Sequence, residues 1–111
     1  MLVPAMRQQL PTDAAHPEGQ RIARRCLVSG RVQGVNYRDS ARRRALAAGI
    51  TGHARNLPDG RVEVVACGAP QPVQAFIAWL WIGPSTARVN AVIVDELPAQ
   101  DVRCTGEFTT G

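Results

Sequence analysis

A glycine-rich loop followed by an arginine is the first place in this sequence where residue types and spacing point to chemistry. The first N–H groups of a helix lack partners within the helix, and the helix dipole is positive there, so a loop before a helix can hold an anion. Arg38 falls in the first turn of a predicted helix, where a cation is unfavourable unless a bound anion offsets the repulsion. Arg38 and the backbone of Gly30, Arg31, Val32, Gln33, Gly34 and Val35 are therefore a candidate phosphate-binding site, although a glycine loop before a helix is by itself a weak signal.

Two simpler interpretations compete with a binding site at this loop. Glycine loops before helices are common for conformational reasons alone. Arg38 could also form a surface ion pair with Asp39 or Asp59, which would leave it no role in binding.

The loop is expected to connect a strand to a helix. Residues 24–30 (RRCLVSG) predict a strand with Cys26 and Val28 on one face and Leu27 on the other. Asn36 is expected to be the N-cap of the helix, with Asp39 in the capping-box position and Gly49 as a left-handed C-terminal cap. The apolar residues at helical spacing are Tyr37, Ala41, Ala45 and Ala48.

A hairpin and a second helix are predicted next. Residues 50–57 and 61–68 read as two strands, and the Leu-Pro-Asp-Gly sequence that joins them is a turn signal, so they should pair antiparallel. Residues Gly83 and Pro84 end the helix that follows. Its apolar stripe is Val73, Phe76, Ile77 and Leu80.

The last elements complete a βαββαβ order. Residues 87–96 predict a strand with Val89, Ala91 and Ile93 on one side, and residues 107–109 a short final strand. This order predicts an α+β fold, the ferredoxin-like α/β sandwich, with an antiparallel sheet and two helices on one face.

The composition excludes several classes of reaction. The chain has 111 residues and 45% hydrophobic content, which is enough for one domain with a modest core. All 13 basic residues are Arg, so a Schiff-base lysine, a pyridoxal-phosphate anchor and a P-loop lysine are excluded. Against 9 acidic residues the net charge is +4, which favours an anionic partner.

The cysteines and histidines predict no metal and no cofactor. Cys26, Cys67 and Cys104 are odd in number and lack a CxxC spacing, so we expect reduced, buried thiols rather than a disulfide or a zinc site. His16 and His53 lie far apart in the chain and outside any ligand motif.

The first 20 residues are expected to be a flexible leader, with the folded domain over residues 21–111. They are rich in Pro, Gln and Ala and have no sustained period. No apolar run approaches the length of a membrane span or a signal h-region, so a cytoplasmic location is the expectation.

Three ordered blocks of the sequence resemble the acylphosphatases, small enzymes that hydrolyse carboxyl-phosphate mixed anhydrides. The resemblance runs from Arg24 to Phe108, and the blocks are GRVQGVNYR at 30–38, GHARNLPDGRVEVVACG at 52–68 and GPSTARVNAV at 83–92. It implies the same fold as that predicted above. It further implies that the N–H groups of the loop hold the phosphoryl oxygens, that Arg38 binds the phosphate and that Asn56 orients the attacking water.

The chemistry of such a substrate fits a site without an acid–base pair. A carboxylate leaving group departs without a general acid, and phosphoryl transfer depends mainly on positioning and on stabilising charge. The resemblance therefore implies a small-molecule acyl phosphate as substrate and inorganic phosphate as product. We separately expect a monomer that binds neither nucleic acid nor membrane. Asn56 as a turn-stabilising residue before Pro58 is the competing interpretation of that position.

Some residues depart from the family pattern. His53 and Ala54 stand where a bulky aromatic and a valine are usual, which puts the pose of Asn56 in doubt. Trp81 and Ile82 fall where polar residues are expected, which suggests an exposed apolar patch and self-association as a hypothesis.

Two alternative functions follow. A catalytically silent acylphosphatase-like module that binds an anion or a partner fits the same fold. An RNA-recognition domain also shares the fold, but residues 61–66 carry no stacking aromatics, and arginines 42–44 are typical of a solvated helix face.

Overall fold

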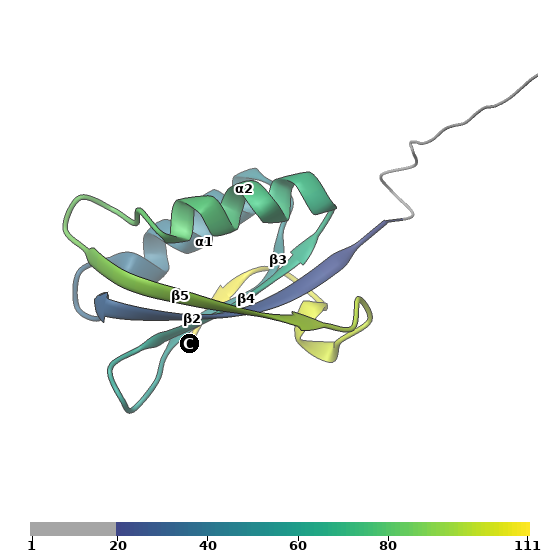
Figure 1. Cartoon of the computed structure of the whole chain (residues 1–111). Helices are drawn as coiled ribbons and strands as arrows, with labels where there is room; N and C mark the ends of the chain where they lie inside the picture. The colour runs from purple at the N-terminus through teal and green to yellow at the C-terminus, as the bar shows by residue number, and fades with distance from the viewer. Residues whose placement is uncertain (1–19) are drawn as a thin grey trace, which may run out of the picture.

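The computed structural model describes residues 20–111, in which a five-stranded sheet carries two helices (Figure 1). The predicted leader, including His16, lies outside this range except for Gln20. The predicted boundary between leader and folded domain at residue 21 stays a prediction. The elements in chain order are β2 (Ile22–Arg31), α1 (Tyr37–Ala47), β3 (Thr51–Asn56), β4 (Val62–Gly68), α2 (Pro70–Leu80), β5 (Arg88–Leu97), the 3-10 helix η3 (Val102–Cys104) and β6 (Thr109–Thr110).

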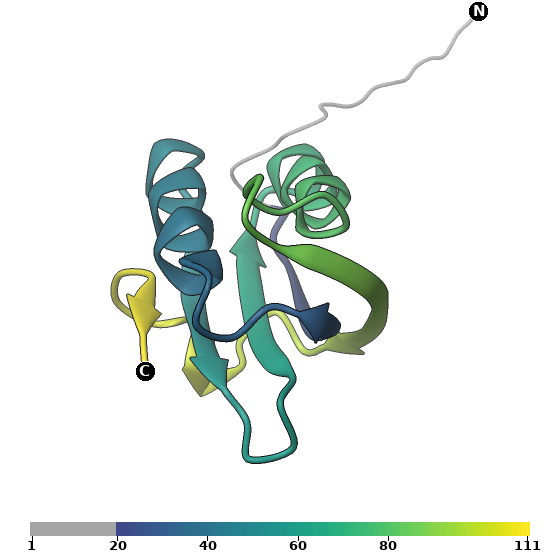
Figure 2. The ribbon, with the colours of Figure 1, turned by 90° about the vertical axis from the view of Figure 1, so that its left-hand side faces the viewer.

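The sheet has the strand order β5-β2-β4-β3-β6, and both helices lie on one of its faces (Figure 2). The predicted ferredoxin-like order and the single helical layer are confirmed. The other face, which we call the open face, carries no helix longer than η3 within residues 20–111. Neither α1 nor α2 is long and apolar enough to cross a membrane, and no other α-helix occurs in this range.

The prediction of a wholly antiparallel sheet is wrong at its last strand. β6 pairs parallel with β3, and it consists of Thr109–Thr110 instead of residues 107–109. Neighbouring strands alternate in direction from β5 to β3, so the last residue of β5 and the first residue of β3 lie at the same end of the strands. After β5 the chain crosses the sheet from this end to the outer side of β3. When it forms β6 there, it runs in the same direction as β3.

A bulge changes which residues of β5 face the core. The register between β2 and β5 shifts after Ser29, so that Ala91 and then Val89 are paired and Asn90 is the extra residue. As a result Val92 is buried and Ile93 is exposed, which contradicts the predicted side for Ile93. A simple alternation of side chains cannot reveal such an extra residue.

The two helices supply the rest of the core. Tyr37, Ala41 and Ala45 are fully buried on α1, but Ala48 lies past the helix end and is exposed, contrary to prediction. Gly49 has a φ of +70° and is the predicted left-handed cap. The predicted exposure at the end of α2 is confirmed for Trp81 and Ile82, which are 50% and 70% exposed.

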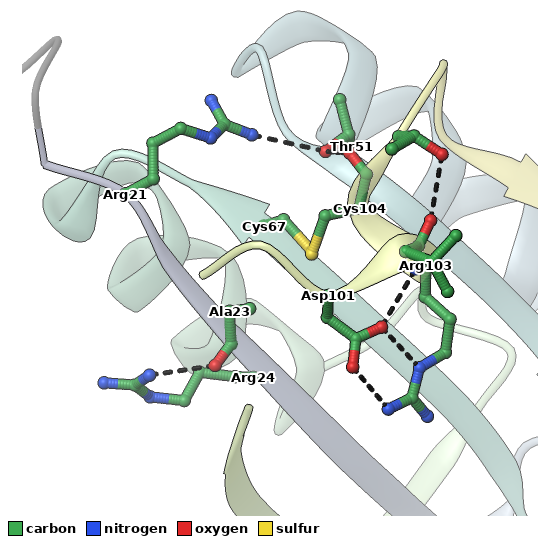
Figure 3. The surroundings of a disulfide bond; sticks show 10 residues. Arg21, Ala23, Arg24, Thr51, Cys67, Asp101, Arg103 and Cys104 are labelled. Atoms are coloured by element: carbon green, nitrogen blue, oxygen red, sulfur yellow. Dashed lines mark hydrogen bonds and ion pairs between the residues drawn. A yellow bond between two sulfur atoms is a disulfide. The ribbon is translucent and has the colours of Figure 1, made fainter. Parts of the chain in front are cut away.

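The expectation of three reduced thiols is wrong for two of them. A disulfide joins Cys67 of β4 to Cys104 of η3, with 5.5 Å between their Cα atoms (Figure 3). The two residues are 37 positions apart, and only the crossing of the chain over the open face brings them together. Cys26 is free and buried, and burial raises its thiol pKa to about 12.

Candidate active site

The chain leaves β2 at a position that only glycine can occupy. Gly30 has a φ of +125°, and a Cβ there would collide with the carbonyl oxygen of Arg88 in β5. Gly30 and Arg31 are the last residues of β2 and pair with β5. The loop between β2 and α1 therefore comprises residues 32–36 instead of beginning at residue 30 as predicted. The role of these two residues in phosphate binding stays a prediction.

Residues 32–36 and the first turn of α1 form an open cradle of N–H groups. Gly34 and Asn36 have left-handed backbones, with φ of +76° and +68°, and turns of this kind form anion-binding concavities. Within residues 20–111, no N–H group of residues 32–38 donates to a backbone carbonyl. A depression of about 130 Å³ is lined by Val32, Gly34, Asn36, Tyr37, Arg38 and Asp39.

The predicted capping box at the start of α1 is wrong. A capping side chain belongs to a residue with an extended backbone, whereas Asn36 is left-handed and its side chain makes no cap hydrogen bond. Asp39 instead pairs with Arg43, at 3.3 Å between oxygen and nitrogen. The N–H groups of the first turn are thereby left available to a ligand.

Arg38 is half-buried in the first turn of α1 and has no carboxylate partner within the part of the chain that the structure describes. The two alternative partners considered above are both engaged elsewhere. Asp39 pairs with Arg43, and Asp59 pairs with Arg61 at 2.8 Å. The ion-pair interpretation of Arg38 is therefore wrong within residues 20–111, and Arg38 lines the cradle without a carboxylate partner there.

Asn56 is the last residue of β3 and is exposed. A depression of about 470 Å³ lies beside it, lined by Arg38, Arg55, Asn56, Leu57, Pro58 and Gly111. Arg38 borders this depression as well as the cradle, so the structure brings together the two side chains that the sequence singled out.

The two unusual residues before Asn56 lie on opposite faces of β3. Ala54 is fully buried in the core beneath the helices, whereas the Nε2 atom of His53 lies 2.8 Å from the Oε1 atom of Glu63 on the open face. Because side chains alternate along a strand, Asn56 lies on the Ala54 side, toward α1. The departure from the family pattern is thus compatible with a well-anchored strand end.

Glu63 is a buried charge that sequence reasoning missed. Its side chain is 2% exposed, and its oxygens accept hydrogen bonds from Arg25 Nε at 2.6 Å and from Arg55 Nε at 2.9 Å, besides the contact with His53. Burial raises the pKa of this carboxyl, but hydrogen bonds from His53 and Arg25 and the charges of Arg55 and Arg25 outweigh it and lower the pKa to about 2. The cluster ties β2, β4 and β3 together on the open face.

Three side chains hold the cradle against its neighbours through four hydrogen bonds, which no local pattern of the sequence predicts. Gln33 Nε2 donates to the carbonyls of Leu57 and Arg61, both at 2.9 Å. Thr86 Oγ1 donates to the carbonyl of Val35 at 2.6 Å, and the buried hydroxyl of Tyr37 donates to the carbonyl of Leu80 at 2.6 Å. The last of these gives Tyr37 a role that a phenylalanine could not fill. The set fixes the loop to the β3–β4 turn and to the end of α2.

This arrangement can bind a phosphoryl group and present a water to it. Unpaired N–H groups and the Arg38 guanidinium offer hydrogen-bond donors and positive charge to anionic oxygens. The carboxamide of Asn56 can both donate to and accept from water without adding negative charge. The domain is thus ferredoxin-like in fold and carries at its site the donors that a phosphoryl group requires.

Comparison with known proteins gives this domain its family. The family model described as acylphosphatase matches residues 24–109. The chain is 56% identical over 71 residues to an acylphosphatase of Chromohalobacter salexigens (61% of this chain, 79% of that one), and 53% identical over 89 residues to an acylphosphatase of Xanthomonas euvesicatoria (80% and 98%). The solved acylphosphatase structure from Coxiella burnetii superimposes with a TM-score of 0.78 at 35% identity, covering 86% of this chain and 98% of that chain. The chain belongs to the acylphosphatase family.

Proposed function

We propose that this chain hydrolyses the carboxyl–phosphate bond of small-molecule acyl phosphates, with Arg38 and Asn56 as its catalytic residues. The products are a carboxylate and inorganic phosphate. The observation that carries the proposal is the position of Arg38, which has no carboxylate partner within residues 20–111 and borders both the cradle and the depression at Asn56.

The cradle and Arg38 bind the phosphoryl group. In phosphoryl transfer, charge is spread over the three equatorial oxygens, and catalysis is mostly positioning and electrostatic stabilisation. The N–H groups of residues 32–38 and the guanidinium of Arg38 supply donors to those oxygens. Arginine suits this role because its planar fork of donors matches phosphate and stays charged at any working pH.

Asn56 positions the attacking water. A neutral carboxamide accepts a hydrogen bond from water without repelling the phosphate dianion, as a carboxylate would. The water attacks phosphorus, the bond from phosphorus to the acyl oxygen breaks, and the carboxylate leaves with that electron pair. Both protons of the water stay on the phosphate oxygens, so that the dianionic substrate gives a carboxylate and dihydrogen phosphate. Since a carboxylate is a good leaving group at neutral pH, the mechanism requires no general acid.

The experiment that tests this function is hydrolysis of benzoyl phosphate in EDTA by the purified protein, beside Arg38→Ala and Asn56→Ala. Turnover by the parent that is lost in both variants supports the proposal. Arg42→Ala and Asn90→Ala are matched controls, because Arg42 lies on the same helix and Asn90 is exposed on β5. A folded parent that binds phosphate without turnover would instead favour the catalytically silent module.

A cytoplasmic location and a monomeric state stay predictions from the sequence. The Cys67–Cys104 disulfide weighs against the first, because disulfides are uncommon in a reducing cytosol. The exposed Trp81 and Ile82 weigh against the second. Cell fractionation tests the location, and sedimentation that changes with concentration would contradict the monomer.

A further inference from the structure

The side chain of Gln33 connects the phosphate cradle to the strand end that carries Asn56. Its Nε2 atom donates to the carbonyl oxygens of Leu57 and Arg61, both at 2.9 Å, in a partly buried position. The mechanism described above uses only the backbone N–H of Gln33, so this side chain has no role in it. In Figure 1 the loop after β2 and the turn between β3 and β4 lie at the same end of the sheet.

We propose that Gln33 is a positioning residue, which sets the place of Asn56 relative to the phosphoryl group held in the cradle. The inference rests on the function proposed above. Leu57 directly follows Asn56, and its carbonyl also accepts from the N–H of Gly60 at 3.1 Å, while its N–H donates to Arg61 at 2.8 Å. Gln33 therefore bonds to the residues on both sides of the turn between β3 and β4. One of them, Leu57, is adjacent in sequence to Asn56.

An amide of this length is the group that fits the position. One nitrogen must donate to two carbonyl oxygens at once, and a primary amide nitrogen carries the two hydrogens that this requires. A carboxylate has no hydrogen to donate, and asparagine is shorter by one methylene group. Within residues 20–111, these two bonds are the only hydrogen bonds between residues 32–36 and residues 57–61.

The connection matters because the water and its target are held by different elements. The phosphoryl group is bound by the loop and the start of α1, whereas the water is bound at the end of β3. In-line attack requires the two to be aligned, and a misplacement of about 1 Å can reduce a rate on the order of 100-fold. Binding of phosphate to the cradle, in contrast, does not depend on where Asn56 lies.

The test compares turnover with phosphate binding in Gln33→Met and Gln33→Asn. Methionine removes both donors at nearly the same size and without adding charge, and asparagine keeps the donors but shortens their reach. We expect kcat for benzoyl phosphate to fall about 10- to 100-fold in both variants. The inhibition constant of inorganic phosphate should change less than about threefold, on the order of the loss of one weak contact. Gln74→Met on the exposed side of α2 is the matched control, and it should leave both quantities unchanged.

The possible outcomes separate this inference from the function on which it rests. A fall in kcat with phosphate inhibition preserved supports the positioning role. Equal kcat in the parent and both variants would overturn it, and so would a parallel loss of turnover, phosphate inhibition and thermal stability, which indicates a merely structural role. An inactive parent would overturn the proposed function itself, and the inference with it.

Discussion

Arg38 at the cradle and Arg25 on the open face of the sheet are both partly buried, yet only one of them is neutralised. Arg25 lies 2.6 Å from a Glu63 oxygen, and this carboxylate also accepts from Arg55. Arg38 has no carboxylate partner within residues 20–111, although Asp39 is its neighbour in the chain. The open face uses arginine to join strands, whereas the cradle holds a guanidinium without a carboxylate partner and N–H groups without a carbonyl partner within residues 20–111.

This difference predicts that replacing Arg38 lowers catalytic activity, whereas replacing Arg25 lowers stability. Arg38→Ala should reduce kcat/KM for benzoyl phosphate by at least 10²–10³-fold, about 3–4 kcal/mol by analogy with the loss of one donor to a transition-state oxyanion. Its thermal midpoint should stay close to that of the parent, because the side chain pairs with no carboxylate in the described range. A loss of less than tenfold would contradict the role of Arg38.

Asn56→Ala separates binding from chemistry within the site itself. It should lower kcat on the order of 100-fold through loss of water positioning, while phosphate still inhibits at a similar concentration. Steady-state kinetics with phosphate as competitive inhibitor measures both quantities. A variant that keeps its turnover would mean that Asn56 only stabilises the turn before Pro58.

The Glu63 cluster should control stability and its dependence on pH. Glu63→Gln is expected to lower the free energy of unfolding at pH 7 by about 2 kcal/mol, since hydrogen bonds to a charged group are lost. The folded-state pKa of about 2 is below the ordinary 4.5, so the stabilisation is complete above pH 4.5 and disappears as the pH falls toward 2.

Urea unfolding at several pH values checks this prediction. The difference in stability between the parent and Glu63→Gln should shrink as the pH falls from 5 toward 2 in the range set by that pKa. A difference that stays constant over this range would show that the charge of Glu63 is not what stabilises the strands.

The smallest expected effect concerns the hydroxyl of Tyr37. Tyr37→Phe removes its hydrogen bond to the Leu80 carbonyl and leaves a buried acceptor, at a cost of about 1 kcal/mol. Thermal unfolding should detect this loss, and turnover should hardly change. Unchanged stability would indicate that the carbonyl of Leu80 finds another donor.

The order of elements was accessible from the sequence because it depends on local patterns, and the loop before α1 singled out Arg38. The role of Asn56 came only from the resemblance to the acylphosphatases, and the roles of both residues stay predictions. Helical spacing, turn residues and the motif around the loop all act over a few neighbouring positions. The bulge at Asn90, by contrast, moved Ile93 to the solvent side, and no local rule marks where an extra residue is inserted. The pairing between β2 and β5 determines where the bulge lies.

The remaining surprises come from contacts between distant segments. Glu63 lies in a strand whose seven residues are all buried, and its partner Arg25 is 38 positions away. The disulfide depends on the path of the chain across the open face. Asn36 has the residue type of an N-cap but a left-handed backbone, because the loop turns into the cradle there. Only the assembled fold determines each of these features.

Three residues donate to Glu63, and the oxygen that each contacts determines how well its replacement is tolerated. His53 and Arg55 both bond to Oε1, whereas Arg25 is the donor recorded for Oε2 within residues 20–111. Replacing either His53 or Arg55 leaves each oxygen with a donor, but replacing Arg25 strands a buried oxygen. We therefore expect positions 53 and 55 to tolerate replacement one at a time, and replacement at position 25 to cost more stability.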